Sequence, residues 1–230
     1  MANFQDYINT ELRKEAISIR NDATLNPRTD DAGNWTGCQI NKGELIGTYR
    51  DISACLYSQI LGRPTTKKEL QSITEKEAEQ IIKTYFWDKL KLDRIPDQET
   101  ANICIHIFLH YGNVKIIQKA LNKLGAKLVP DGIAGIKTNT ALLNYTANNS
   151  IQTYNIIREE LKINYEIANP VYRNTFLETL EKHFPPKEEN FYFYGFDNGE
   201  NIYIFLDPEQ ESKIKNKKIC IVYDSTQKYI

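Results

Sequence analysis

The 230-residue sequence predicts a mainly α-helical protein with a small β-hairpin or β-meander at its C-terminal end. Up to His183, apolar residues recur every three or four positions, which is the period of an amphipathic helix. After Pro185 and Pro186 the period falls to two, and β-branched and aromatic residues dominate. We therefore expect a helical body over residues 1–184 and a small β appendage over residues 185–230.

The N-terminal part is expected to contain one helix and one long loop. Apolar residues at helical spacing predict a helix from Phe4 to about Arg20. Residues 21–47 are instead rich in Asn, Asp, Gly, Thr and Pro, which is typical of a structured loop or a short hairpin. Loops of this length inside a compact domain are usually functional or disordered. Trp35 within the loop favours order.

Seven further helices are expected in the body, and several carry start or stop signals. Ser72 and Thr74 precede a Glu-rich first turn, which is typical of a capping box. Asp97 opens a helix that buries isoleucines and ends near Gly112, and Gly125 stops the next one. The expected ranges are 51–62, 74–87, 97–112, 114–124, 137–145, 151–168 and 171–183.

The β appendage contains three candidate strands, residues 191–196, 201–207 and 217–224. Asp197, Asn198 and Gly199 lie between the first two, and this is a strong hairpin signal. So short a sheet would not be stable alone, so we expect it to pack on the helical body or on a partner.

Composition and charge exclude several classes of protein. The formal net charge of -1 provides no basic field, so nucleic-acid binding is not expected. The sequence has no apolar run of membrane-spanning length and no N-terminal secretion signal. We therefore expect a protein made in the cytoplasm that reaches the periplasm or cell wall after lysis or injection. The four cysteines are expected to be buried free thiols, with a disulfide left open, and no metal or cofactor is predicted.

Two stretches of the sequence resemble glycoside hydrolase family 108, a family of lysozyme-like N-acetylmuramidases. The first, residues 26–54, contains Gly33-Asn34-Trp35-Thr36-Gly37 and Gly43-Glu44-Leu45. The second, residues 112–142, contains Ile117-Gln118, Asp131-Gly132, Gly135 and Thr138, and is similar to the peptidoglycan-binding segment associated with the family. The resemblance covers about residues 4 to 180. It implies a muramidase-like part over residues 1–111 and a peptidoglycan-binding-like part over residues 112–184.

The resemblance also implies a substrate and a set of site residues. The substrate would be peptidoglycan, cleaved at the β-1,4 bond after N-acetylmuramic acid by a carboxylic acid with help from a second carboxylate. The family acid lies at the end of the first helix, and two alignments place either Glu15 or Arg20 there; Arg20 cannot donate a proton. The implied residues are Glu15, Asp30, Asp31 and Thr36 for catalysis, and Trp35, Glu44, Tyr49, Gln118 and Asp131 for substrate binding.

Several family positions carry different residues here. Cys38 and Asp51 replace glycines, and His106 and His110 replace an Asp and an Asn. The two histidines, four residues apart on one helix face, are expected to be core residues, although this spacing can also ligate a metal. Asp131-Gly132 with Gly135 can likewise be a tight turn without a ligand, and Trp35 can anchor its own loop.

These departures leave two functions open. The chain can be an active peptidoglycan hydrolase, as a phage endolysin or an injected antibacterial effector. It can also be an inactive lysozyme-like module that binds peptidoglycan or docks, through residues 186–230, to a phage tail, a secretion apparatus or an immunity protein.

Overall fold

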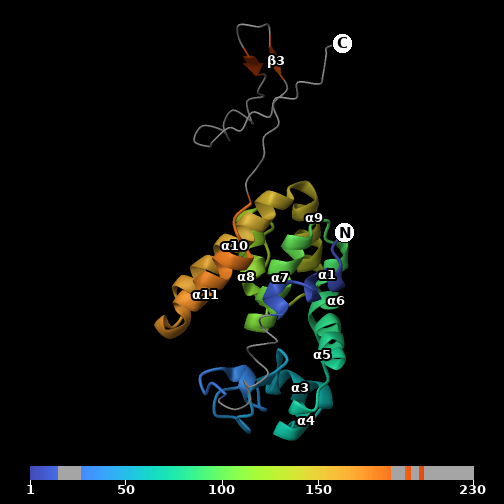
Figure 1. Cartoon of the computed structure of the whole chain (residues 1–230), viewed down its shortest axis with the longest axis vertical. Helices are drawn as coiled ribbons and strands as arrows, with labels where there is room; N and C mark the ends of the chain where they lie inside the picture. The colour runs from blue at the N-terminus through green and yellow to red at the C-terminus, as the bar shows by residue number, and fades with distance from the viewer. Residues whose placement is uncertain (15–26, 188–194, 198–201, 205–230) are drawn as a thin grey trace. The chain divides into compact units, whose positions relative to one another are not determined.

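A computed structural model describes residues 1–14, 27–187, 195–197 and 202–204 (Figure 1). The chain divides into two compact units, Met1–Lys187 and Glu188–Ile230. The described part of the first unit is mainly α-helical, as the sequence predicts.

The N-terminal helix is shorter than predicted. Helix α1 spans Phe4–Ile8, and a turn interrupts the helical course before the next described residues become helical again. Thr10 causes the break, because its hydroxyl donates to the carbonyl of Tyr7 at 2.8 Å and accepts the backbone N–H of Arg13 at 3.3 Å. A threonine that accepts this bond caps a new helix rather than continuing the old one. The rest of the predicted helix lies outside the described residues.

The body of the first unit is built from successive helices. They are α3 (Ala54–Leu61), α4 (Lys67–Gln71), α5 (Glu75–Ile82), the π-helical turn η2 (Lys83–Trp87), α6 (Asp88–Leu90), the 3-10 turn η3 (Leu92–Arg94), α7 (Gln98–Tyr111), α8 (Lys115–Lys123), α9 (Ile136–Asn148), α10 (Ser150–Glu166) and α11 (Pro170–His183). The capping box at Thr74 and Glu77 and the start of α7 at Asp97 confirm the predicted signals. Helix α4 was not predicted; Thr66 and Glu69 form its capping box.

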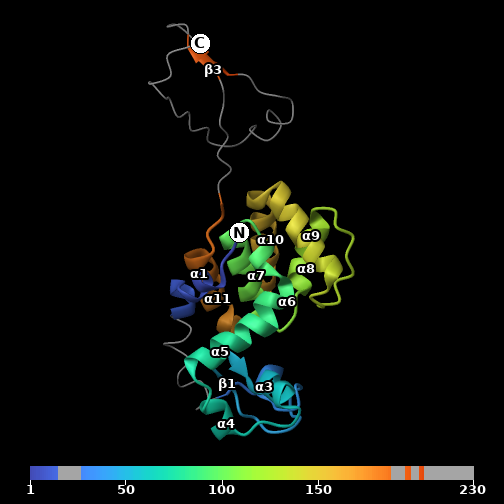
Figure 2. The same cartoon turned by 90° about the vertical axis from the view of Figure 1, so that its right-hand side faces the viewer.

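Helix α7 forms the centre of the core. Its residues Ile103, Ile105 and Ile107 are fully buried, as predicted. Helix α10 packs against both α7 and α8 (Figure 2). Trp87 is also buried and makes an edge contact with Phe4, which ties α1 to the body.

The end of the first unit is fixed to the body by a lysine clamp. The ammonium group of Lys187 lies 2.9 Å from the Asp97 carboxylate and 2.7 Å from that of Glu99. The Tyr154 hydroxyl donates to the carbonyl of Pro185 at 2.9 Å. The boundary between the two compact units follows directly after this clamp.

Two small antiparallel sheets complete the described structure. In the first unit, β1 (Thr48–Tyr49) pairs with β2 (Ile52–Ser53) across a two-residue turn. The turn residues Arg50 and Asp51 both have positive φ, 50° and 64°, as a type I′ hairpin requires. In the second unit, β3 (Gly195–Asp197) pairs with β4 (Ile202–Ile204), as the hairpin signal predicts. The predicted third strand, residues 217–224, lies outside the described residues.

Candidate functional site

The long loop that precedes β1 folds around the buried side chain of Asn34, which is 6% exposed. Its amide nitrogen donates to the carbonyl of Arg28 at 3.0 Å, and its amide oxygen accepts the Thr48 hydroxyl at 2.9 Å. Its backbone carbonyl accepts the N–H groups of Ile46 and Gly47 at 2.9 and 3.1 Å. One residue therefore joins the start of the loop, its end and strand β1.

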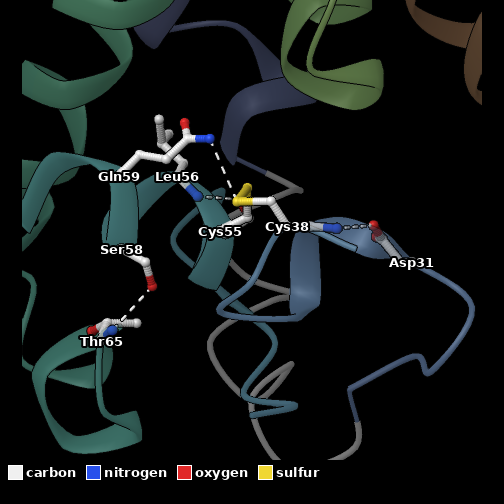
Figure 3. The surroundings of a disulfide bond; sticks show 9 residues. Asp31, Cys38, Cys55, Leu56, Ser58, Gln59 and Thr65 are labelled. Carbon is white, nitrogen blue, oxygen red and sulfur yellow. Dashed lines mark hydrogen bonds between the residues drawn. A yellow bond between two sulfur atoms is a disulfide. The ribbon is translucent and has the colours of Figure 1, made fainter. Parts of the chain in front are cut away.

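A disulfide between Cys38 and Cys55 ties this loop to helix α3 (Figure 3). The two Cα atoms are 4.8 Å apart, although the cysteines are 17 residues apart in sequence. The expectation of free thiols was wrong for this pair, because the fold of the loop brings the residues together and sequence spacing does not show it. Cys104 is a buried free thiol, as expected, and burial raises its pKa. Cys220 lies outside the described residues.

Thr36, a predicted catalytic residue, is buried within the loop. Its hydroxyl accepts the backbone N–H of Glu44 at 2.9 Å, and its own N–H donates to the Glu44 carbonyl at 3.0 Å. Gly43 makes this turn possible, because it has a φ of 79° and an added Cβ would lie 2.3 Å from the Thr36 hydroxyl. The Thr36 hydroxyl thus holds the loop in shape, and the Glu44 residue beside it is exposed.

The two predicted carboxylates of the loop, Asp30 and Asp31, are both exposed and both have local partners. Asp30 forms an ion pair with Arg28 at 3.0 Å, and this hydrogen bond lowers the pKa of Asp30. Asp31 accepts the backbone N–H of Gly33 at 2.9 Å and caps the 3-10 turn η1 (Ala32–Asn34). The guanidinium of Arg28 also lies 4.0 Å above the ring of Tyr172, so the loop contacts helix α11.

The predicted aromatic residues of the site are half-buried. The indole N–H of Trp35 donates to the carbonyl of Thr29 at 3.1 Å, so Trp35 anchors its own loop. It also forms an isolated β-bridge with Leu45. Tyr49 lies on β1, with the guanidinium of Arg50 5.4 Å from the centre of its ring. Both rings keep an accessible portion beside the loop.

Sequence reasoning missed an ion pair between Arg13 and Asp51. Their side chains are 2% and 9% exposed, and they join the helical residues before Glu15 to the turn between β1 and β2. A buried charge needs such a partner. Asp51, which stands at a family glycine position, has therefore gained a structural contact. The candidate acid Glu15, as well as Arg20 and Asp22, lies outside the described residues.

The predicted binding residues Gln118 and Asp131 contact each other. The Gln118 side chain is buried, and its amide nitrogen donates to the Asp131 carboxylate at 2.8 Å and to the Thr138 hydroxyl at 3.1 Å. Its amide oxygen accepts the N–H of Gly132 at 2.8 Å. The hydrogen bond from Gln118 is the main cause that lowers the pKa of Asp131. In the described structure, these hydrogen bonds of Gln118 hold the loop between α8 and α9 in shape.

The two histidines on α7 face the aromatic residues of α10 and α11. His106 is half-buried and lies 2.8 Å from the Tyr165 hydroxyl, whereas His110 is exposed and its ring stands edge-on to Phe176. The expectation of a core position was therefore wrong for His110, because α11 covers its ring only in part. Within the described ranges, no cluster of three or more His, Cys, Asp or Glu side chains has a metal-binding arrangement.

Comparison with known proteins supports the resemblance. Residues 23–112 match the glycosyl hydrolase 108 family, which confirms the resemblance found in the sequence. The structure of Brucella abortus SagA is similar, with a TM-score of 0.53 and 17% identity over 74% of this chain and 90% of that chain. No match to a curated protein was found. Among the described residues, no helix combines the length and apolar character that membrane crossing requires.

Proposed function

We propose that the protein is a peptidoglycan hydrolase of the N-acetylmuramidase type, which cleaves the β-1,4 bond after N-acetylmuramic acid. The observation that carries the proposal is the match of residues 23–112 to glycosyl hydrolase 108. It is supported by the ordered loop within that range, which Asn34 and the Cys38–Cys55 disulfide hold beside β1 and α3. The protein would act in the cell wall, as an endolysin or an injected effector.

The proposal assigns the general acid to Glu15. A general acid at neutral pH needs a raised pKa, which requires burial without a cationic partner. Asp30 and Asp51 do not meet this condition, because each is paired with an arginine. Asp31 is occupied as the cap of η1. Glu15 follows the buried Arg13 by two positions in sequence and is the remaining predicted carboxylate for this role.

The other predicted residues have supporting roles under the proposal. The lowered pKa of Asp30 keeps its carboxylate ionised, so it can accept a hydrogen bond from a water molecule and orient it, with Asp31 beside it in sequence. The accessible portions of Trp35 and Tyr49 would stack on sugar rings. Thr36 would act by holding Glu44, whose exposed carboxylate would accept hydrogen bonds from sugar hydroxyls.

The test compares Glu15→Gln with Glu11→Gln on purified peptidoglycan. Glutamine keeps the shape of glutamate and cannot supply the proton, so Glu15→Gln should lower the release of muropeptides with new reducing ends by about 100- to 10,000-fold. Glu11 is an exposed partner of Lys14, so Glu11→Gln should retain full activity. Equal activity of the two variants would remove Glu15 from the mechanism.

A second candidate function is favoured by the Arg13–Asp51 ion pair. Asp51 stands where the family has a glycine, and here its side chain stabilises the fold by pairing with Arg13. Such a replacement is expected if selection for catalytic turnover was relaxed. The protein would then be an inactive module that binds peptidoglycan. It should co-sediment with insoluble peptidoglycan and release no soluble product, whereas any new reducing ends from the wild-type chain would rule this out.

A further inference from the structure

An open groove of about 590 Å³ lies between the loop after α8 and the exposed face of α9. Figure 2 shows this loop beside α9. The groove is distinct from the loop that holds Asp30 and Trp35. Its lining residues are Gly125, Ala126, Lys127, Leu128, Ile136, Lys137, Thr140, Ala141, Asn144, Tyr145 and Asn148.

The charge of the groove is positive, although the whole chain has a formal net charge of -1. Lys127 and Lys137 line it, and no acidic residue does. Neither lysine forms an ion pair with any described residue, whereas nearby Lys123 is paired with Glu160. Two unpaired ammonium groups beside one groove favour a ligand that carries carboxylates.

The polar side chains of α9 add hydrogen-bonding groups along the groove. Thr140, Asn144 and Asn148 follow each other at four-residue intervals, so they lie on one face of the helix. All three are exposed, and their side chains form no hydrogen bond with the described part of the chain. Side-chain amides can donate to and accept from peptide groups, so this row fits an extended ligand rich in amides.

The wall of the groove opposite α9 is held in one conformation. The Asn122 side chain bonds both backbone groups of Leu128, donating to its carbonyl at 2.8 Å and accepting its N–H at 2.5 Å. Gly125, with a φ of 102°, begins the loop that forms this wall. The hydrogen bond between the Gly132 N–H and the Gln118 side chain fixes the other end of the loop. A binding surface that is ordered before the ligand arrives loses less entropy on binding.

We propose that this groove binds the stem peptide of peptidoglycan, with peptide carboxylates on Lys127 and Lys137 and peptide amides on Asn144 and Asn148. The inference rests on the proposed function, which makes peptidoglycan the substrate. The peptide fits better than the glycan, because the stem peptide carries the free carboxylates. The groove would hold the enzyme on peptide-bearing wall while a separate site cleaves the glycan.

The test is calorimetric titration of the full chain with two probes, the free stem tetrapeptide and peptide-free glycan strands. The double variant Lys127→Glu/Lys137→Glu should lower the affinity for the peptide at least about tenfold, the factor given by 1.4 kcal/mol. The matched control Lys67→Glu/Lys68→Glu reverses two exposed lysines on α4 and should bind as the wild type does. Asn144→Ala, which preserves charge, should weaken binding less.

Three outcomes would overturn the proposal: no peptide binding by the wild type, undiminished binding by the double variant, or binding of the glycan strands alone. Circular dichroism and thermal unfolding of each variant check that the fold is retained. Hydrolysis of peptide-free glycan strands distinguishes a failure of this proposal from a failure of the proposed function. The groove variant should keep that hydrolysis, and Glu15→Gln should lose it while still binding the peptide.

Discussion

Two loops of the first unit are each organised by one buried side-chain amide, but they differ in the other interactions that hold them. The loop before β1 and the loop between α8 and α9 have little regular secondary structure, so their backbone groups need other partners. In each loop one buried side-chain amide supplies them, Asn34 in the first and Gln118 in the second. An amide suits this task, because it donates and accepts at once.

The two loops differ in what reinforces the amide. The first loop has a covalent link, the Cys38–Cys55 disulfide, and a surface ion pair between Arg28 and Asp30. The second loop is held, among the described residues, by hydrogen bonds around Gln118 and by those from Asn122 to the backbone of Leu128. We therefore expect the stability of the first loop to depend on the redox state of its cysteines and on the salt concentration. The stability of the second loop should depend on neither.

The largest expected difference concerns the disulfide. Cys55→Ala should lower the free energy of unfolding by about 3 kcal/mol, because the link closes a loop of similar length to those for which this cost is typical. Urea unfolding with and without a dithiol reductant measures the effect. Reductant should destabilise the wild type by a similar amount and leave Cys55→Ala unchanged. A reductant effect that persists in Cys55→Ala would assign the sensitivity to another cysteine.

The second prediction removes the amide at the centre of the other loop. Gln118→Leu should cost about 2 kcal/mol, because the Gly132 N–H and the Thr138 hydroxyl lose a buried partner. The exposed residue Gln152 on α10 offers a control, and Gln152→Leu should stay within about 0.5 kcal/mol of the wild type. Urea unfolding should give the same loss with and without reductant. A loss that depends on reductant would show that the two loops are coupled.

The sequence predicted the helices well because their signals are local. Capping residues such as Thr74 and Asp97 act within four positions, and buried isoleucines of α7 recur at helical spacing. The signal for the break at Thr10 is local too. It was missed because the apolar residues on both sides of Thr10 keep helical spacing, which favours one continuous helix.

The site was less predictable, because its contacts link residues far apart in sequence. The pairs Cys38–Cys55 and Arg13–Asp51 depend on how the loop folds, and no spacing rule identifies them. Gln118 was assigned to substrate binding from its motif, and the structure uses its amide internally. The polar row on α9 had a signal, four-residue spacing of Thr140, Asn144 and Asn148, that sequence reasoning did not use.

The smallest expected effect compares one aspartate from each loop at low pH. Hydrogen bonds lower the pKa of both, from Arg28 to Asp30 and chiefly from Gln118 to Asp131. A carboxyl with a lower pKa in the folded state stabilises the fold above its unfolded value of about 3.9 and loses that contribution as pH falls through the folded value. Asp30→Asn and Asp131→Asn should therefore each flatten the decline of Tm below about pH 4.

Added salt should change the contribution of Asp30 to stability but not that of Asp131, because their partners differ in charge. Arg28 is a cation in an exposed ion pair, so added salt screens its attraction for Asp30. The main partners of Asp131 are the neutral Gln118 amide and the backbone N–H of Ile133, which salt screens little. Thermal unfolding of the wild type and both variants across the acid range, starting well above the unfolded pKa of about 3.9, in dilute buffer and in about 1 M salt, where the Debye length is about 3 Å, measures this. The difference between Asp30→Asn and the wild type should vanish in salt, and that for Asp131→Asn should persist. Equal salt sensitivity at both positions would mean that the hydrogen bond from Gln118 does not set the pKa of Asp131.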